Sequence, residues 1–139
     1  INDIPVLNEI SVESKMYWNY PNEWIDKWRE NLTVTENSIN CNSIFKLLLG
    51  NRIVGFCSIS NNPDHYEIDH LWIKPEFIGK GYGKYLLNES LRESVKENKK
   101  IIVISDPNAE NFYKKNGFKR IDKVESFPKG RFLPLMEKR

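Results

Sequence analysis

The segment from Ile78 to Lys84 carries a glycine at every second position, as Gly79, Gly81 and Gly83. Glycines leave the neighbouring backbone N–H groups with little side-chain cover. An apolar run that ends at Ile73 precedes the segment, and apolar residues recur behind it at four-residue spacing, as Leu87, Leu91 and Val95. This order predicts a strand, a turn and the start of a helix. Because the first N–H groups of a helix are unpaired and lie at the positive end of its dipole, the segment is suited to bind a phosphate.

Spacing separates the kinds of phosphate loop that such a segment can form. A P-loop needs a longer gap before its Gly-Lys pair and a Ser or Thr behind it. Three residues lie between Gly79 and Gly83, and Tyr85 follows Lys84. A dinucleotide loop needs a glycine where Lys84 stands. A nucleotide phosphoryl-transfer enzyme is therefore disfavoured, also because no convincing acidic metal site is present. A plain turn is the alternative for this segment alone.

A second segment, from Asn108 to Phe118, is predicted to form a short helix. Asn108 is a good N-cap, and Gly117 suits the left-handed residue that ends a helix. Ala109, Phe112 and Tyr113 share one helix face. Taken singly, the two aromatic residues would be ordinary core residues.

Together the two segments resemble the signatures of the GCN5-related N-acetyltransferase (GNAT) family. The first is similar to its x-x-G-x-G pyrophosphate loop, and the second to its A-x-x-F-Y-x-K-x-G-F motif at every specified position. They stand in the family's order with a short strand, Ile101 to Ser105, between them, and the resemblance covers roughly Arg52 to Phe118. It implies an α/β fold with a mixed, mostly antiparallel, splayed sheet flanked by helices. It also implies acetyl-CoA as cosubstrate and no metal.

The resemblance implies three sets of coenzyme contacts. The end of the central strand would contact the thioester and pantetheine through Leu71, Trp72 and Ile73. The loop would bind the pyrophosphate through Ile78, Gly79, Lys80, Gly81, Tyr82, Gly83 and Lys84. The later helix would add Asn108 and Phe112. Ile78 departs from the family, which usually has Gln or Arg there, so a polar side-chain contact is missing and Lys80 or Lys84 is the candidate to replace it.

Amine acetylation needs a base for the ammonium, a donor for the oxyanion and an acid for the thiolate. Alternation along Tyr66 to Ile73 puts Glu67, Asp69 and Leu71 on one face and Ile68, His70 and Trp72 on the other, and the apolar run after it predicts a bulge. Glu67 falls where the family's histone acetyltransferases carry their base, so it is the first candidate. Asp69 is the second, and His70 the third because it points the other way if the alternation holds. Solvated surface charges are the alternative.

Tyr113 matches the family's usual general acid near the coenzyme sulfur, or a residue that only orients the sulfur. The resemblance places the acceptor between the early helices and the later strands. Those helices are rich in aromatic residues, so Tyr20 and Trp24, with Asp69 and His70, are candidates to line a pocket for a flat or cationic amine. Core packing is the alternative for Trp24 and Trp28.

The rest of the chain alternates helical and strand patterns. Ile10 to Cys41 is predicted to be mainly helical, broken at Pro21, with Thr35 capping a short helix. Further strands are predicted at Ile44 to Leu49, Ile53 to Ser60, Phe118 to Val124 and Phe132 to Met136, and a helix from Lys84 to about Glu97.

Composition fits a small intracellular enzyme. The 139 residues predict one acetyltransferase domain, residues 1–139, and a net charge of +2 from 21 basic and 19 acidic residues gives no sign of a nucleic-acid or membrane partner. Cys41 and Cys57 are too few for a disulfide framework, which indicates a reducing compartment. No membrane-spanning run or signal peptide is seen, although the chain begins at Ile1 without Met. We therefore expect a cytoplasmic monomer or homodimer.

The sequence thus predicts an N-acetyltransferase that moves an acetyl group from acetyl-CoA to a primary amine of a small molecule or peptide by direct attack. The alternative is a non-catalytic module that binds an acyl-CoA as a sensor or partner.

Overall fold

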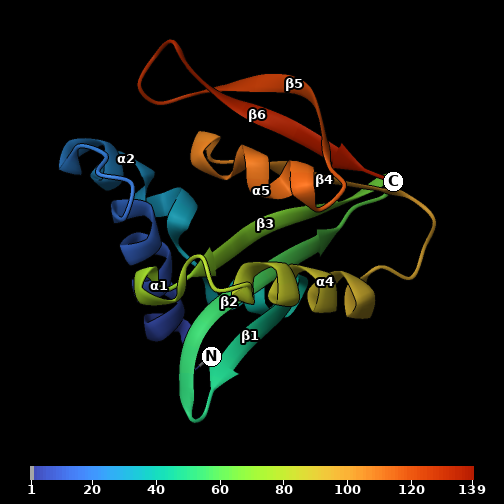
Figure 1. The fold of residues 1–139 in the computed structure, drawn as a ribbon, viewed down its shortest axis with the longest axis horizontal. Helices are drawn as coiled ribbons and strands as arrows, with labels where there is room; N and C mark the ends of the chain where they lie inside the picture. Colours follow the sequence, from blue (N-terminus) through green and yellow to red (C-terminus); the bar gives the residue numbers. More distant parts are fainter. Residues whose placement is uncertain (1) are drawn as a thin grey trace.

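One mixed sheet carries the strands of the computed structural model, which describes residues 2 to 139 (Figure 1). The strand order is β1-β2-β3-β4-β6-β5. Only β3 and β4 pair in parallel among the described strands; the other neighbours are antiparallel. The sheet confirms the predicted mixed, mostly antiparallel α/β fold. The strands are β1 Ser43–Leu49, β2 Arg52–Asn61, β3 His65–Ile73, β4 Lys100–Ile104, β5 Lys119–Ser126 and β6 Arg131–Lys138.

Helices cover both faces of the sheet (Figure 1). On one face lie α4 and α5, and on the other lie α1 and α2, followed by α3. The helices are α1 Ile4–Met16, α2 Asn22–Leu32, α3 Glu36–Cys41, α4 Tyr82–Ser94 and α5 Glu110–Lys115, with single 3₁₀ turns at Pro75–Phe77 and Pro107–Ala109. The predicted break at Pro21 is confirmed, as is the cap of α3, where the Thr35 side chain accepts from the N–H of Ser38.

Apolar side chains hold the two helix layers to the sheet. On the α4 face, Leu87 is fully buried against strand residues that include Ile68, and burial of such a side chain contributes about 2 kcal/mol. On the other face, Ile10 of α1 packs on Phe56 of β2. A further buried cluster joins Ile25, Trp28 and Leu32 of α2. Both faces of the central strands are therefore fixed, and so is the direction of their side chains.

The sheet opens between β3 and β4. These strands pair only from His65 with Lys100 to Ile68 with Val103, and they separate beyond that point. On the opposite side of β3, His70 pairs with Ser58 and Ile68 with Ile59, so Asp69 is an extra residue in the ladder. This is the predicted bulge. A bulge bends its strand, which accounts for the splay of β3 away from β4.

Two boundaries differ from the sequence-based expectation. Asn108 does not cap α5; instead the Asp106 carboxylate accepts the N–H of Asn108 at 2.8 Å and starts the 3₁₀ turn at Pro107. A carboxylate is a strong cap, and proline fits the first position of a helical turn because its missing N–H would have no partner there. Helix α4 runs from Tyr82 to Ser94 rather than from Lys84 to Glu97. Gly117 has the predicted left-handed conformation, with φ +93°.

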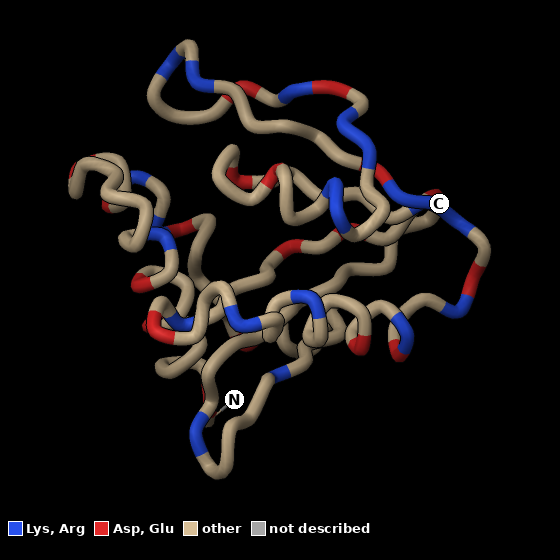
Figure 2. The backbone as a smooth tube through the Cα atoms, in the orientation of Figure 1, with Lys and Arg blue, Asp and Glu red and all other residues tan. Residues whose placement is uncertain are grey.

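Charged residues are spread over the whole chain, with Lys and Arg near Asp and Glu in most elements (Figure 2). No helix in residues 2–139 is long and apolar enough to cross a membrane.

Candidate active site

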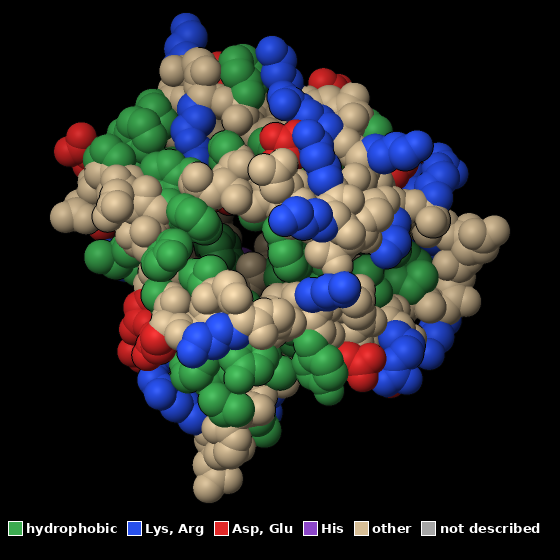
Figure 3. All heavy atoms as spheres, viewed as in Figure 1, with side chains coloured by type: hydrophobic (Ala, Val, Ile, Leu, Met, Phe, Trp, Pro, Cys, Tyr) green, Lys and Arg blue, Asp and Glu red, His purple; other side chains and the backbone are tan. Residues whose placement is uncertain are grey.

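Two cavities open where β3 and β4 separate. The first, which we call the α5 cavity, has a volume of about 380 Å³ and lies between β3, the loop before α4, and α5. The second, which we call the hairpin cavity, has a volume of about 710 Å³ and lies between α1, α2, β3 and the β5–β6 hairpin. Figure 3 looks onto the α4 and α5 face and shows a hollow bordered by hydrophobic side chains. The two cavities share Ile68, Asp69, His70, Trp72, Ile104 and Asp106, so they meet at the gap between the strands.

The glycine loop lies at one end of the α5 cavity, which Ile78 and Gly79 help to line. Gly79 and Gly81 have φ +84° and +85°, a conformation that other residues rarely adopt. No acceptor in residues 2–139 receives the N–H of Gly79, Lys80 or Gly81, and the first N–H groups of α4 are free by geometry. The loop is therefore a cluster of unpaired backbone donors that suits a phosphate group.

Two lysines and two close packing contacts complete the loop. Lys80 and Lys84 are exposed beside it. Tyr82 packs edge-on against Phe77. Gly83 lies in the first turn of α4, where an added Cβ would come within 3.3 Å of the Phe112 ring. Gly83 is therefore needed for the close approach of α4 to α5.

The opposite wall of the α5 cavity is the splayed part of β3. Leu71 and Ile73 turn toward the α4 side and pack against its core, and Trp72 packs toward α1 and α2. The backbone from Leu71 to Ile73 has no strand partner on the gap side in residues 2–139, where the Ile73 carbonyl accepts from Ser14 Oγ at 2.6 Å. This edge of β3 can therefore donate and accept hydrogen bonds along an extended ligand.

Tyr113 reaches the α5 cavity from α5. It is 5% exposed and is held between the rings of Phe112 and Phe118 at centroid distances of 5.2 and 5.4 Å. Burial raises the pKa of its hydroxyl above the ordinary value, and the nearby Cys57 adds to this. The hydroxyl therefore stays protonated at neutral pH and can donate a proton or a hydrogen bond.

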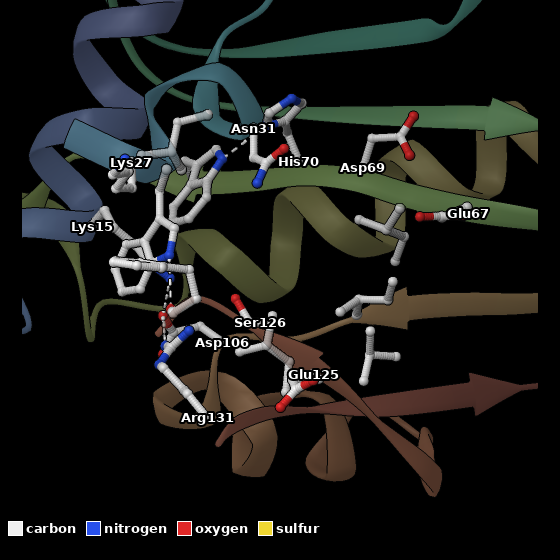
Figure 4. A pocket seen from close by; sticks show the side chains of 18 residues that line it. Lys15, Lys27, Asn31, Glu67, Asp69, His70, Asp106, Glu125, Ser126 and Arg131 are labelled. Atoms are coloured by element: carbon white, nitrogen blue, oxygen red, sulfur yellow. Dashed lines mark hydrogen bonds and ion pairs between the residues drawn. The ribbon is translucent and has the colours of Figure 1, made fainter. Parts of the chain in front are cut away.

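Glu67, Asp69 and His70 all line the hairpin cavity (Figure 4). The expectation that His70 points away from Glu67 is wrong, because the bulge at Asp69 reverses the alternation along β3. Burial lowers the pKa of His70 to about 4, and its Nδ1 accepts from Trp72 Nε1 at 3.1 Å. His70 is therefore neutral at pH 7, with its remaining proton on Nε2.

Asp69 is exposed as a residue, yet its carboxyl group is partly desolvated. Desolvation, and then repulsion from Glu67, raise the pKa of Asp69 to about 6, against hydrogen bonds from Ser60 and Asn42. The Asn42 amide donates to Asp69 Oδ2 at 3.0 Å. A carboxylate with this pKa can accept a proton near neutral pH.

Tyr20, Trp24 and Asn108 lie beside the cavities in a polar and aromatic cluster. Neither Tyr20 nor Trp24 lines either cavity. Trp24 packs on the rings of Tyr20 and Trp28, which is the core-packing alternative for these tryptophans. Asn108 lines the α5 cavity, and its amide donates to the Tyr20 hydroxyl at 2.9 Å and to Asp106.

The buried charged side chains of this cluster were not predicted from the sequence. Lys15 forms an ion pair with Asp106, and Arg131 lies 4.0 Å from the same carboxylate. All three residues line the hairpin cavity. Desolvation alone would raise the pKa of Asp106, but attraction to Lys15 and several hydrogen bonds outweigh it and lower the pKa. Lys15 and Asp106 stand 91 positions apart, so no local motif indicates the pair.

No group of three or more His, Cys, Asp and Glu side chains in residues 2–139 is placed to hold a metal ion. The two cavities present backbone donors, a buried phenol and the carboxylates of Glu67 and Asp69.

Comparison with solved structures gives acetyltransferases. PaiA N-acetyltransferase from Thermoplasma acidophilum, in complex with coenzyme A, is 24% identical with a TM-score of 0.79, over 99% of this chain and 93% of that one. A GNAT family acetyltransferase from Elizabethkingia anophelis with acetyl-CoA bound is 16% identical with a TM-score of 0.64, over 74% and 79%. An aminoglycoside 6'-N-acetyltransferase complexed with coenzyme A is 16% identical with a TM-score of 0.70, over 96% and 91%. At these identities the likeness shows a shared fold.

The family itself is shown by sequence. No match was found among curated proteins. A family model described as an acetyltransferase (GNAT) domain matches residues 18–139, which is most of the chain and includes the glycine loop, the splayed strand and Tyr113. The chain therefore belongs to the GNAT acetyltransferases and is an acetyl-CoA-dependent acetyltransferase.

Proposed function

We propose that this enzyme is an N-acetyltransferase that moves the acetyl group from acetyl-CoA to a primary amine by direct attack. The observation that carries the proposal is the meeting of two cavities at the β3–β4 gap. One has free backbone donors at its end and an apolar wall, and the other has the carboxylates of Glu67 and Asp69 along β3. Such an arrangement lets a donor and an acceptor be held together at the gap.

The α5 cavity fits the extended shape of the coenzyme. The amides of Gly79 to Lys84 would bind the pyrophosphate, with Lys80 or Lys84 adding charge where Ile78 offers none. The unpaired edge of Leu71 to Ile73 would hydrogen-bond the pantetheine arm. Phe112 and Asn108 complete the wall.

The chain's own groups would serve the proton transfers. Acetyl-CoA supplies the thioester carbonyl and the thiol leaving group. Glu67, directly or through water, would take the proton from the ammonium, with Asp69 as the second candidate. The backbone N–H groups at the splayed edge of β3 would stabilise the oxyanion. The N–C bond then forms, the C–S bond breaks, and Tyr113 would hold its hydroxyl proton for the departing sulfur.

We propose a small-molecule or peptide amine as the acceptor, since the hairpin cavity has the size of a small-molecule site. The similar aminoglycoside 6'-N-acetyltransferase supports an amine acceptor. We also propose that residues 1–139 act as one domain. In support, helices from the first third of the chain and strands from the last third pack on the same sheet.

Thermal melts test the coenzyme part of the proposal. Acetyl-CoA is expected to raise the melting temperature, because it binds only the folded state. At a hundredfold excess over its Kd, it adds about 2.7 kcal/mol to the free energy of unfolding. ATP with magnesium and NAD are expected to give no shift. A shift with either of these and none with acetyl-CoA would overturn the proposal.

A screen of amines and peptides, read by release of coenzyme A, tests the transfer itself. Release that depends on an added amine is the expected result. Binding of acetyl-CoA without release against the whole panel would favour the non-catalytic sensor.

A further inference from the structure

The hairpin cavity carries opposite charges at its two ends. Figure 4 shows Lys15, Asp106 and Arg131 together at one end and Glu67 and Asp69 toward the other. Lys27 also lies at the first end, which therefore has three cations and one anion. The second has two carboxylates. Glu125 lies between the two ends and accepts from the N–H of Gly130 at 3.1 Å.

The cationic end is held rigidly inside the protein. The side chains of Lys15, Asp106 and Arg131 are only 9%, 9% and 13% exposed. The Trp28 ring packs under both cations, 4.6 Å from Lys15 Nζ and 4.5 Å from Arg131 Cζ. Lys15 and Arg131 share the Asp106 carboxylate, so the cluster of these three side chains has a net positive charge and little contact with solvent.

The carboxylate of this cluster is already saturated, whereas the guanidinium is not. Asp106 accepts from Lys15, Tyr20 and Asn108. Arg131 donates through Nη2 to the Tyr20 hydroxyl at 3.1 Å, and its Nε and Nη1 donate to no group in residues 2–139. Among the described residues, the buried side-chain polar atoms that lack a hydrogen-bond partner are Ser90 Oγ and Ser94 Oγ. The two Arg131 nitrogens are not among them, so they are not fully enclosed. A guanidinium with two free donors is the preferred partner of a carboxylate.

The aromatic rings beside the cluster are not free for a cationic ligand. Lys15 and Arg131 each lie 5.1 Å from the centre of the Tyr20 ring, besides their contacts with Trp28. The chain's own cations therefore occupy the ring faces that an ammonium group would need. A cationic acceptor gains nothing at this end of the cavity, whereas an anionic group gains two partners.

We propose that the acceptor is a small amino carboxylate, whose carboxylate binds Arg131 and Lys15 while its amine faces Glu67 and Asp69. The proposal rests on the proposed function of the same cavity and names the class of its acceptor. It makes Arg131 a specificity-determining residue.

The strand register gives the span of such a ligand. Glu67 pairs with Ile102, four residues before Asp106 on the next strand, which at about 3.3 Å per residue is about 13 Å along the sheet. Asp69 follows the last pair of this ladder, Ile68 with Val103, and so lies nearer to Asp106 along the strand direction than Glu67 does. An amine separated from its carboxylate by several carbons fits this span.

Three five-carbon probes test the proposal. They are δ-aminovalerate, which has an amine and a carboxylate, pentylamine, which lacks the carboxylate, and cadaverine, which has a second amine instead. Release of coenzyme A from acetyl-CoA gives kcat/KM for each. Calorimetric titration of each probe into protein saturated with coenzyme A gives its affinity. We expect δ-aminovalerate to exceed both others at least about tenfold in each measurement, as a charge-assisted contact predicts. Equal values, or a preference for cadaverine, would overturn the inference.

Variants separate recognition from general damage. Arg131→Gln is expected to reduce the ratio of kcat/KM for δ-aminovalerate to kcat/KM for pentylamine to near one. Arg131→Lys is expected to retain part of the preference for δ-aminovalerate. Arg29→Gln is the matched control, because Arg29 is exposed on α2 and lines neither cavity. A ratio that Arg131→Gln leaves unchanged in correctly folded protein would assign the preference elsewhere and overturn the proposal.

The proposed function and the proposed acceptor class can be disproved separately. If no probe releases coenzyme A and acetyl-CoA gives no thermal shift, the proposed function fails. Calorimetric titration of the same probes into the protein without coenzyme then decides whether the cavity binds amino carboxylates. If all three amines are acetylated equally, the function stands and the inference is wrong.

Discussion

The α5 cavity and the hairpin cavity are built from different parts of the chain. The first is formed mainly by backbone groups and apolar side chains of the stretch between Leu71 and Tyr113. The second has charged side chains beside apolar ones, and they come from α1, α2, β3 and the β5–β6 hairpin. Backbone donors do not depend on side-chain identity, so they suit a cosubstrate that is the same in every family member. Side chains from several elements can differ between members and so can suit different acceptors. The following substitutions test that division.

The largest expected effect is the loss of coenzyme binding in Gly81→Val. The φ of Gly81 is +85°, and a branched residue there costs about 1–2 kcal/mol of strain, besides phosphate hydrogen bonds lost at about 1.5 kcal/mol or more each. Affinity for acetyl-CoA should fall about a thousandfold. Gly50→Val is the matched control, because Gly50 has φ +64° in the β1–β2 turn and equally open surroundings. Thermal shifts with acetyl-CoA compare the two, and an equal loss in both would show that unfolding is the cause.

The hairpin cavity should respond instead to the removal of a charge. Lys15→Met leaves the buried Asp106 with only the more distant Arg131, 4.0 Å away, and breaking a buried pair costs up to about 3–5 kcal/mol of unfolding free energy. The double variant Lys15→Met with Asp106→Asn should recover a large part of that loss. Urea unfolding measures all three proteins. A single variant that is as stable as the original chain would contradict a tightly coupled pair.

Tyr113 lines the α5 cavity, and as a proton donor it should affect the rate alone. Tyr113→Phe should lower turnover by roughly ten- to a thousandfold while coenzyme affinity hardly changes, because the ring remains and the proton donor is lost. Tyr85→Phe is the control, since Tyr85 is 59% exposed on α4. Steady-state rates and titration of acetyl-CoA give both quantities. A weaker affinity with an unchanged kcat would make Tyr113 a binding residue.

The smallest expected effect concerns the base and depends on pH. Glu67→Gln should lower the rate about tenfold at low pH and less as the pH approaches the pKa of the amine, where free amine exists without a base. If Asp69 is the base instead, its pKa of about 6 makes activity fall as the pH drops through 6, since a protonated carboxyl cannot accept a proton. In that case Glu67→Gln would move this limb to lower pH, because it removes the repulsion that raises the Asp69 pKa, and Asp69→Asn would abolish activity. Rate profiles of both variants distinguish the two candidates.

Features that depend on neighbouring residues could be predicted from the sequence. The glycine loop, the bulge in β3 and the Thr35 cap each follow from a few adjacent positions, and all three are found. The predicted orientation of His70 was wrong although a bulge was expected. The position of the extra residue, Asp69, decides which side chains change face. The predicted cap near α5 was wrong by two residues, because a 3₁₀ turn precedes α5 and Asp106 caps that turn by accepting the N–H of Asn108.

The charged cluster of the hairpin cavity could not be predicted. Lys15 reaches Asp106 across 91 positions, and Arg131 joins them from the start of β6. Each of these residues has the sequence surroundings of an ordinary surface charge. Only the packing of α1 and the hairpin against the same end of β4 brings them together. The elements around the α5 cavity could therefore be predicted from sequence patterns, and the charged end of the hairpin cavity could not.

The hairpin formed by β5 and β6 lines part of the hairpin cavity and none of the α5 cavity. At the edge of the sheet, β5 pairs only with β6 among the described strands, and the Trp28 indole anchors the turn by donating to the Phe127 carbonyl at 3.1 Å. Met136 of β6 is buried in the same core cluster as Tyr113, and β6 pairs with β4, so the far part of the hairpin belongs to the core. The turn around Phe127 has no such ties, so its length and sequence can vary while the glycine loop and the splayed strand stay unchanged. Under the proposed function, chimaeras that exchange this turn alone would be expected to alter the acceptor and keep the acetyl donor.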